Sequence, residues 1–183
     1  MDRIKTGQKG FTLIELLVAI PIAALVMLAA SGVLIQLVHS SRASAQMNAI
    51  RQVQMAGTWI SRDGLQAEAV TITSGNGFPC TFVWHDYNVA NAPKHTVVYS
   101  LVPSGSGTLV HLQRQETVGG ATPTTTTRMV ARNLVSAGNA TALSWTDSFA
   151  KTAFRFQVVS TVGQETESRT YDVTPRPAGV PGL

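Results

Sequence analysis

The chain has 183 residues, of which 44% are hydrophobic and 13% are charged, whereas an ordinary soluble domain has about 25% charged residues. This composition excludes a disordered or collagen-like chain. The net charge is only +4, and no basic run follows residue 10, so we expect no nucleic-acid partner. Cys80 is the single cysteine, which excludes an intrachain disulfide and a cysteine-based zinc site.

The chain begins with a basic segment that precedes a long apolar one. Its basic residues are Arg3, Lys5 and Lys9. No charged residue occurs in residues 16–35, and a helix over that range would span about 30 Å, the thickness of a bilayer core. Because positive residues stay on the cytoplasmic side, the pattern predicts a single-pass protein of the cytoplasmic (inner) membrane. Its amino terminus lies inside, and residues after His39 are periplasmic or extracellular.

Two ordinary interpretations of this segment compete with a third. A secretory signal peptide has a shorter apolar core, of about 7–15 residues. A plain signal anchor would have this length. Neither accounts for Glu15, a carboxylate just inside the apolar run, where a charge is costly unless it has a partner or a function.

The string K-G-F-T-L-I-E-L-L-V-A-I at residues 9–20 resembles the class III leader of type IV pilins and type II secretion pseudopilins. The resemblance implies that a prepilin peptidase cuts between Gly10 and Phe11 and methylates the new amino terminus at Phe11. It also implies that Glu15 pairs with the terminal amine of a neighbouring subunit and sets the axial register of a filament, because an unpaired buried charge is costly. The alternative is a carboxylate satisfied by the positive end of its own helix.

Two positions within the apolar segment predict local weakness in a helix. Pro21 removes one hydrogen bond and crowds the carbonyl of Leu17, which kinks or locally opens a helix. Membrane helices tolerate this. Ser31 and Gly32 form the second weak point, and we expect the segment between them and Pro21 to stretch or melt on assembly.

Beyond the membrane segment, one apolar stripe predicts that the helix continues to residues 66–69. The stripe consists of Ala45, Ala49, Val53, Ala56 and Ile60. Residues 60–67 are similar to the end of the stem helix in J-type minor pseudopilins and W-type minor pilins, although Gly64 stands where a bulkier residue is usual. The alternative is that Arg62 and Asp63 are helix-surface residues without a special role.

The rest of the chain is rich in Thr, Val, Ser and Gly, which is typical of strands and loops. Alternation and turn residues predict strands at 70–73, 81–85, 96–102, 108–115, 142–146, 153–161 and 165–174. Turns at 103–107 and 162–164 predict two hairpins. Residues 124–127 are interpreted as part of a flexible loop and residues 175–183 as a flexible tail. The fold class is α+β, with an antiparallel sheet on a long amino-terminal helix.

These patterns divide the chain into five parts. They are a cleaved leader at 1–10, a transmembrane and assembly helix at 11–38, its amphipathic continuation at 39–69, a globular β-rich domain at 70–174 and a tail at 175–183.

No catalytic, cofactor-binding or metal-binding constellation is visible in the sequence. The histidines are dispersed at positions 39, 85, 95 and 111, without the spacing of metal ligands. Cys80 has no visible base and is interpreted as a buried or loop thiol. We therefore expect a protein that is not an enzyme and needs no cofactor.

The sequence favours a structural subunit of an assembly. The resemblance implies a minor pilin or minor pseudopilin, and its implied partners are the prepilin peptidase, other pilin or pseudopilin subunits, the inner-membrane assembly platform and the lipid bilayer. The alternative is a signal-anchored extracellular binding module, for adhesion or DNA uptake, that does not polymerise.

Overall fold

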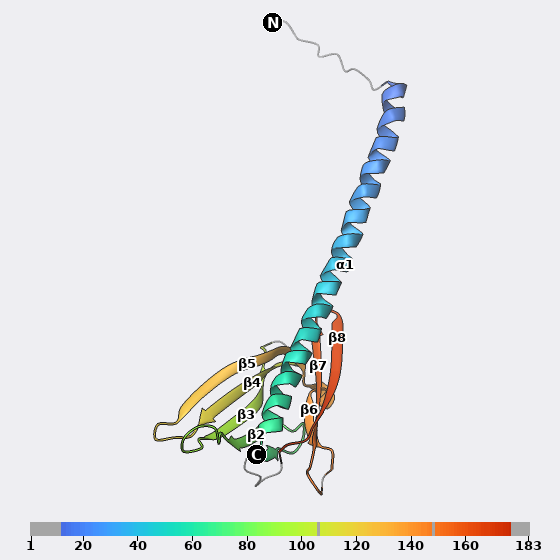
Figure 1. Ribbon diagram of the computed structural model, residues 1–183. Coiled ribbons are helices and arrows are strands. Elements are labelled where there is room, and N and C mark those ends of the chain that lie inside the picture. Colours follow the sequence, from blue (N-terminus) through green and yellow to red (C-terminus); the bar gives the residue numbers. More distant parts are fainter. Residues whose placement is uncertain (1–11, 106, 148, 177–183) are drawn as a thin grey trace, which may run out of the picture. The chain divides into compact units, whose positions relative to one another are not determined.

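A computed structural model of the chain describes residues 12–105, 107–147 and 149–176. The chain divides into two compact units, Met1–Ala43 and Ser44–Leu183. One helix, α1, extends over Leu13–Gln66, as Figure 1 shows. The predicted helix end at residues 66–69 is confirmed. Residues 1–10 and 177–183, which include the predicted leader and most of the predicted tail, lie outside the described residues.

In the first unit, the helix exposes almost every large apolar side chain. None of the side chains that make up its apolar window is buried, and among the described residues α1 alone is long and apolar enough to cross a membrane. The exposed side chains include Leu16, Leu17, Ile20, Leu25, Leu28, Leu34 and Leu37. A continuous apolar surface of this kind needs lipid or other helices around it.

The helix is continuous through both of the predicted weak points. Pro21 lies inside α1, so the lost hydrogen bond does not open the helix, and a kink there stays a prediction. The Ser31 hydroxyl donates a hydrogen bond of 2.7 Å to the carbonyl oxygen of Met27, which satisfies this polar group within its own helix. Melting on assembly also stays a prediction.

In the second unit, one stripe of α1 packs against the sheet. Ala49, Val53, Ala56 and Ile60 are fully buried, which confirms the predicted stripe, and Ala45 is half-buried. These residues recur every three or four positions, so they lie on one face of the helix.

The sheet has eight antiparallel strands among the described residues. Their order is β1-β2-β3-β4-β5-β7-β6, and β8 also pairs with β7. Both predicted hairpins are confirmed, since β3 pairs with β4 and β7 pairs with β8. The strands are β1 (Ala69–Ile72), β2 (Cys80–His85), β3 (Lys94–Pro103), β4 (Leu109–Val118), β5 (Thr124–Val135), β6 (Ala142–Trp145), β7 (Phe154–Val162) and β8 (Glu165–Val173), with a short 3-10 helix, η1 (Ala137–Asn139).

The interpretation of residues 124–127 as a flexible loop is wrong. They form the first part of β5 and pair with β4 from Val118 to Gln115. Their β-branched side chains suit a strand, and the hydroxyls of Thr117 and Thr125 lie 3.1 Å apart across the ladder. All four threonines are exposed, so no apolar alternation marks the strand in the sequence.

The core lies between α1 and one face of the sheet. Every second residue of each core strand points to this face. On β7, Phe154, Phe156 and Val158 are fully buried, as their alternation predicts. Gly64 of α1 packs directly on this layer. A Cβ atom at Gly64 would lie 2.5 Å from the Phe154 ring and 3.0 Å from Val173. The close approach of helix and sheet explains why no bulkier residue stands at this position.

We predict that Gly64→Leu destabilises the second unit by about 2 kcal/mol. Overpacking a filled core costs about 1–3 kcal/mol or more, which exceeds the gain of less than about 1 kcal/mol from better helix propensity. Urea unfolding of the full chain in detergent micelles, followed by tryptophan fluorescence, measures the change. Gly32→Leu is the control because nothing lies within 4 Å of that position, and an equal loss in both variants would contradict the packing argument.

Candidate functional site

The start of α1 places Glu15 in a capping box with Thr12. The backbone N–H of Thr12 donates to Glu15 Oε2 at 3.1 Å, and the Thr12 hydroxyl donates to the same oxygen at 3.0 Å. The N–H of Glu15 lies 3.4 Å from Thr12 Oγ1. This reciprocal arrangement satisfies the free N–H groups of a helix start, and the carboxylate also favours the positive end of the helix dipole.

The carboxylate of Glu15 is therefore satisfied at its own helix start in a single chain, as the alternative interpretation expects. Its pairing with a neighbouring subunit stays a prediction. The other predicted residues of this region, Gly10, Phe11, Arg3, Lys5 and Lys9, lie outside the described residues.

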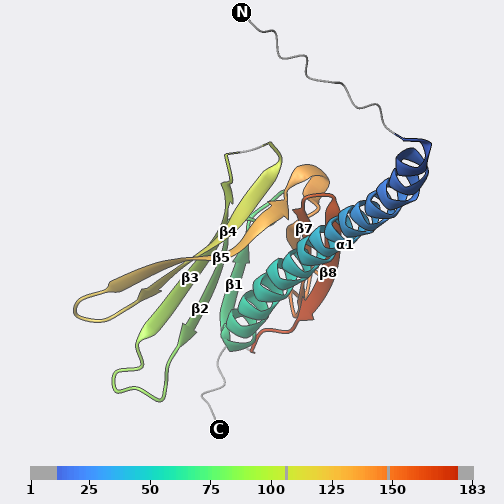
Figure 2. The ribbon, with the colours of Figure 1, turned by 90° about the horizontal axis from the view of Figure 1, so that it is seen from above.

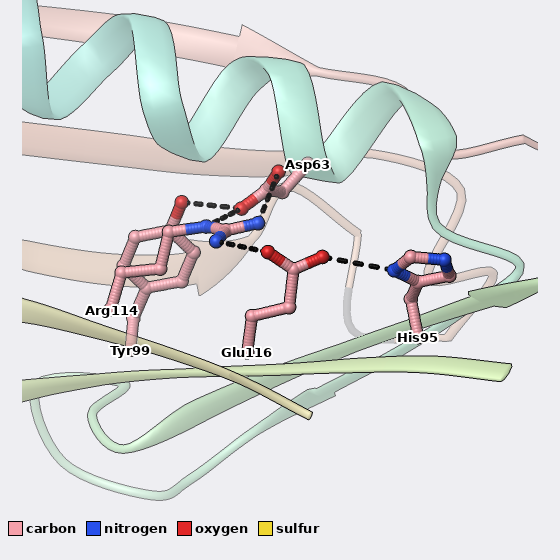
Figure 3. Close-up of polar contacts among 5 residues, drawn as sticks. All are labelled: Asp63, His95, Tyr99, Arg114 and Glu116. Carbon is pink, nitrogen blue, oxygen red and sulfur yellow. Dashed lines mark hydrogen bonds and ion pairs between the residues drawn. The ribbon is translucent and has the colours of Figure 1, made fainter. Parts of the chain in front are cut away.

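In the second unit, Asp63 is the centre of a buried polar network (Figure 3). Its carboxylate accepts hydrogen bonds from Arg114 Nε at 2.7 Å and Nη2 at 3.3 Å, and from the Tyr99 hydroxyl at 2.6 Å. The side chain of Asp63 is 2% exposed and that of Arg114 is 7% exposed. The interpretation of Asp63 as a helix-surface residue is thus wrong.

The network continues from Arg114 along the sheet. Arg114 Nη1 donates to Glu116 Oε2 at 2.7 Å, and His95 Nδ1 lies 2.9 Å from Glu116 Oε1. The His95 ring stacks on Trp84, with centroids 5.3 Å apart. Four strand positions and one helix position are thereby joined through charge-assisted hydrogen bonds, which are stronger than neutral ones.

Position in the helix explains why Asp63 needs a cation. It lies in the last turn of α1, which contains no basic residue, and the negative end of the helix dipole disfavours a carboxylate there. Arg114 supplies the missing positive charge from β4. Burial disfavours its charged form, but hydrogen bonds to Asp63 and Glu116 raise the pKa of Arg114 above its usual range, so its guanidinium stays charged.

The pKa values of Tyr99 and Glu116 are also shifted by their surroundings in the network. Burial and the nearby Asp63 charge raise the pKa of Tyr99, so its hydroxyl stays a donor. Burial would raise the pKa of Glu116, but hydrogen bonds from Arg114 and His95 outweigh it and hold that pKa below its usual range. The stabilisation from Glu116 is therefore present above the unfolded-state pKa of about 4.3 and is lost as the pH falls below it.

Trp59 of α1 lies close to two arginines, one of which belongs to this network. The guanidinium of Arg114 is 5.1 Å from its ring centroid and that of Arg62 is 6.0 Å away. Arg62 is exposed, as the surface interpretation expects for that residue. The indole thus holds Arg62 in place by a cation–π contact.

A polar groove of about 600 Å³ opens beside the network. Its walls come from the end of α1, from β2 to β5 and from the segment after β8. Its lining residues include Arg62, Asp86, Arg114, Thr126, Arg128 and Arg176. Figure 2 shows the strands β2 to β5 fanned out beside the end of α1.

Sequence reasoning missed the strand partners of Asp63. A usable signal was present on β4, where Val110, Leu112 and Arg114 occupy alternate positions and are all buried. A charged residue in the inward phase of a strand implies a buried partner of opposite charge. Which carboxylate fills that role depends on a contact across 51 residues, which no local pattern encodes.

No group of three or more potential metal ligands occurs among the described residues. His85 pairs with Glu68, with 2.8 Å between Nδ1 and Oε2, although the two are far apart in sequence. Cys80 is buried and unpaired, and burial raises its pKa. The interpretation of Cys80 as a buried thiol is confirmed.

Comparison with known proteins identifies the amino-terminal region. Residues 5–31 match the family model of the prokaryotic N-terminal methylation motif. The chain carries this motif, which is consistent with a type IV pilin-like protein. The motif covers residues 5–10 of the predicted leader and the start of the exposed apolar helix, and it supports a processed subunit of the pilin or pseudopilin type. No curated protein and no solved structure matches the chain.

The motif, the apolar helix and the sheet of the second unit are all consistent with a pilin-like protein. The motif implies processing by prepilin peptidase and assembly with other pilin subunits. An apolar helix that can cross a bilayer fits a membrane-anchored pilin. The second unit, with an antiparallel sheet on the continuation of the same helix, completes an α+β fold.

We predict that Asp63→Asn lowers the unfolding free energy of the second unit by about 3 kcal/mol, because Tyr99 and Arg114 lose a charged acceptor and Arg114 keeps only Glu116 as an anionic partner. Urea unfolding in micelles at neutral pH measures it. The matched control is Asp172→Asn, which breaks the Arg155–Asp172 pair, whose side chains are 55% and 54% exposed. That variant should unfold almost as the parent does. Equal effects would show that Asp63 adds no more than a surface pair.

Proposed function

We propose that the chain is a minor pilin or minor pseudopilin, a structural subunit without enzymatic activity. Prepilin peptidase cuts it after Gly10 and methylates Phe11, and its amino-terminal helix then enters a type IV pilus or a type II secretion pseudopilus. The observation that carries this proposal is the methylation motif at residues 5–31, placed directly before an exposed apolar helix.

The exposed helix supports assembly through helix packing. Large apolar side chains cover all sides of α1 in the first unit, so a single chain needs lipid around it. A bundle of similar helices offers an equivalent apolar environment. The subunit can therefore pass from the membrane to a filament without exposing this surface to water.

Glu15 supplies the register of such a bundle. Cleavage after Gly10 creates an amine at Phe11, four residues before Glu15. In a packed apolar bundle, a carboxylate and an ammonium each need an oppositely charged partner. Pairing Glu15 of one subunit with the amine of the next satisfies both charges at a single axial offset, so a subunit that is out of register leaves two charges unpaired.

The basic leader and the apolar helix together give the orientation in the membrane. Arg3, Lys5 and Lys9 hold the leader on the cytoplasmic side, where the assembly platform and the peptidase meet it. The second unit then lies on the other side of the inner membrane, in the periplasm or outside the cell.

We predict that Glu15→Gln lowers incorporation into sheared filaments by at least about tenfold, because the glutamine cannot neutralise a buried ammonium. Insertion in the membrane and removal of the leader should stay unchanged. Quantitative blotting of the sheared and membrane fractions measures both. Thr12→Ala, which removes the capping hydroxyl but keeps the carboxylate, is the control and should still be incorporated. Filament levels of Glu15→Gln equal to those of the parent would favour a simple signal-anchored binding module.

We further predict that Gly10→Leu blocks processing. The variant should then keep the leader and lack amino-terminal methylation. Intact-mass spectrometry of the membrane fraction detects both. Gly7→Leu, in the same leader, is the matched control and should be processed as the parent is. A normal mature mass for Gly10→Leu would rule out cleavage at this position.

A further inference from the structure

We propose that the exposed first part of β5, together with the groove beside it, binds an extended acidic segment of a partner protein, which adds to the sheet as a further strand. This interaction is separate from helix-mediated assembly and does not depend on it.

The first part of β5 is a free strand edge. Residues 124–129 pair with β4 on one side. On the other side, β7 meets β5 at a single pair, Leu134 and Ser160. Closer to the free part, the N–H of Arg132 donates to Gln52 Oε1 at 2.7 Å, so the backbone is occupied from there onward. Residues 124–129 are exposed, and a free edge of this kind presents N–H and C=O groups to another strand.

One face of this edge carries an arginine without a carboxylate partner. Arg128 lies directly opposite Arg114 in the ladder, and like charges in that arrangement repel each other. The charge of Arg114 is taken up by Asp63 and Glu116. Among the described residues, Arg128 forms no ion pair, so a carboxylate brought in by a partner would relieve the repulsion.

Two other arginines that line the groove also favour binding of a carboxylate. Arg62 and Arg176 also line it and form no ion pair with any residue that the structure describes. Of the lining carboxylates, Asp63 and Glu116 belong to Arg114, and Asp86 Oδ1 accepts from the N–H of Asn88. With Arg114 and Arg128, the lining carries four arginines against three carboxylates, so a net positive charge remains, and guanidinium groups bind carboxylates in a bidentate manner.

The strand edge identifies the ligand as a polypeptide. A row of N–H and C=O groups at strand spacing matches another extended backbone, whereas a small anion can use only the arginines. Thr126 and Arg128 both line the groove because side chains at every second position share a face. The added strand would accordingly place every second side chain over the groove, so acidic residues should alternate with neutral ones.

The test uses the full chain in detergent micelles and a labelled eight-residue peptide with glutamate at every second position and threonine between. Fluorescence anisotropy measures its Kd. Arg128→Glu should weaken binding by at least about tenfold, through loss of one charge pair and gain of a repulsion. Arg169→Glu is the matched control: Arg169 is exposed on β8, and its substitution should leave the Kd nearly unchanged.

Two further peptides separate charge from strand pairing. A peptide with lysine in place of glutamate, and a glutamate peptide with every backbone amide N-methylated, should both bind at least about tenfold more weakly. The proposal is overturned if the glutamate peptide does not bind, if Arg128→Glu and Arg169→Glu behave alike, or if the N-methylated peptide binds as tightly as its parent.

Discussion

The buried pair of Asp63 and Arg114 is the interaction on which the arrangement of the second unit depends. It joins the last turn of α1 to β4, and Tyr99 extends it to β3. Leaving one member of such a pair without its partner costs about 3–5 kcal/mol, a large part of the stability of a small domain. Apolar packing along α1 is non-directional, whereas the hydrogen bonds of this pair require a defined position and direction. Arg114 also lies 5.1 Å from the centroid of the Trp59 ring, and both members of the pair line the groove.

Much of the fold could be predicted from local patterns. The stripe from Ala49 to Ile60 gave the buried face of the helix because its spacing of three and four residues has a single geometric solution. Alternation at Phe154 and Phe156, with turn residues on either side, was enough to place β7 and its hairpin. The N-terminal methylation motif was visible in twelve residues because the residues that define it are contiguous in the sequence.

Features that depend on distant contacts were not predictable. Asp63 was interpreted as a surface residue because its partner lies 51 positions away, and no neighbouring residue in the sequence indicates that it is buried. The threonines at 124–127 read as a loop because a strand exposed on both faces has no apolar phase. In that segment the pairing with β4, and not the burial of side chains, makes the strand.

The capping box at Thr12 and Glu15 has a consequence for the reversibility of assembly. Both hydrogen bonds that the structure describes to the Glu15 carboxylate come from Thr12, three residues away. The Glu15 carboxylate is thus hydrogen-bonded before assembly. It can exchange these hydrogen bonds for the amine of a neighbouring subunit without first being left unpaired. In the proposed filament, subunit addition would then be an exchange of partners with a small net enthalpy, and the same exchange in reverse would return a subunit to the membrane with its helix start intact.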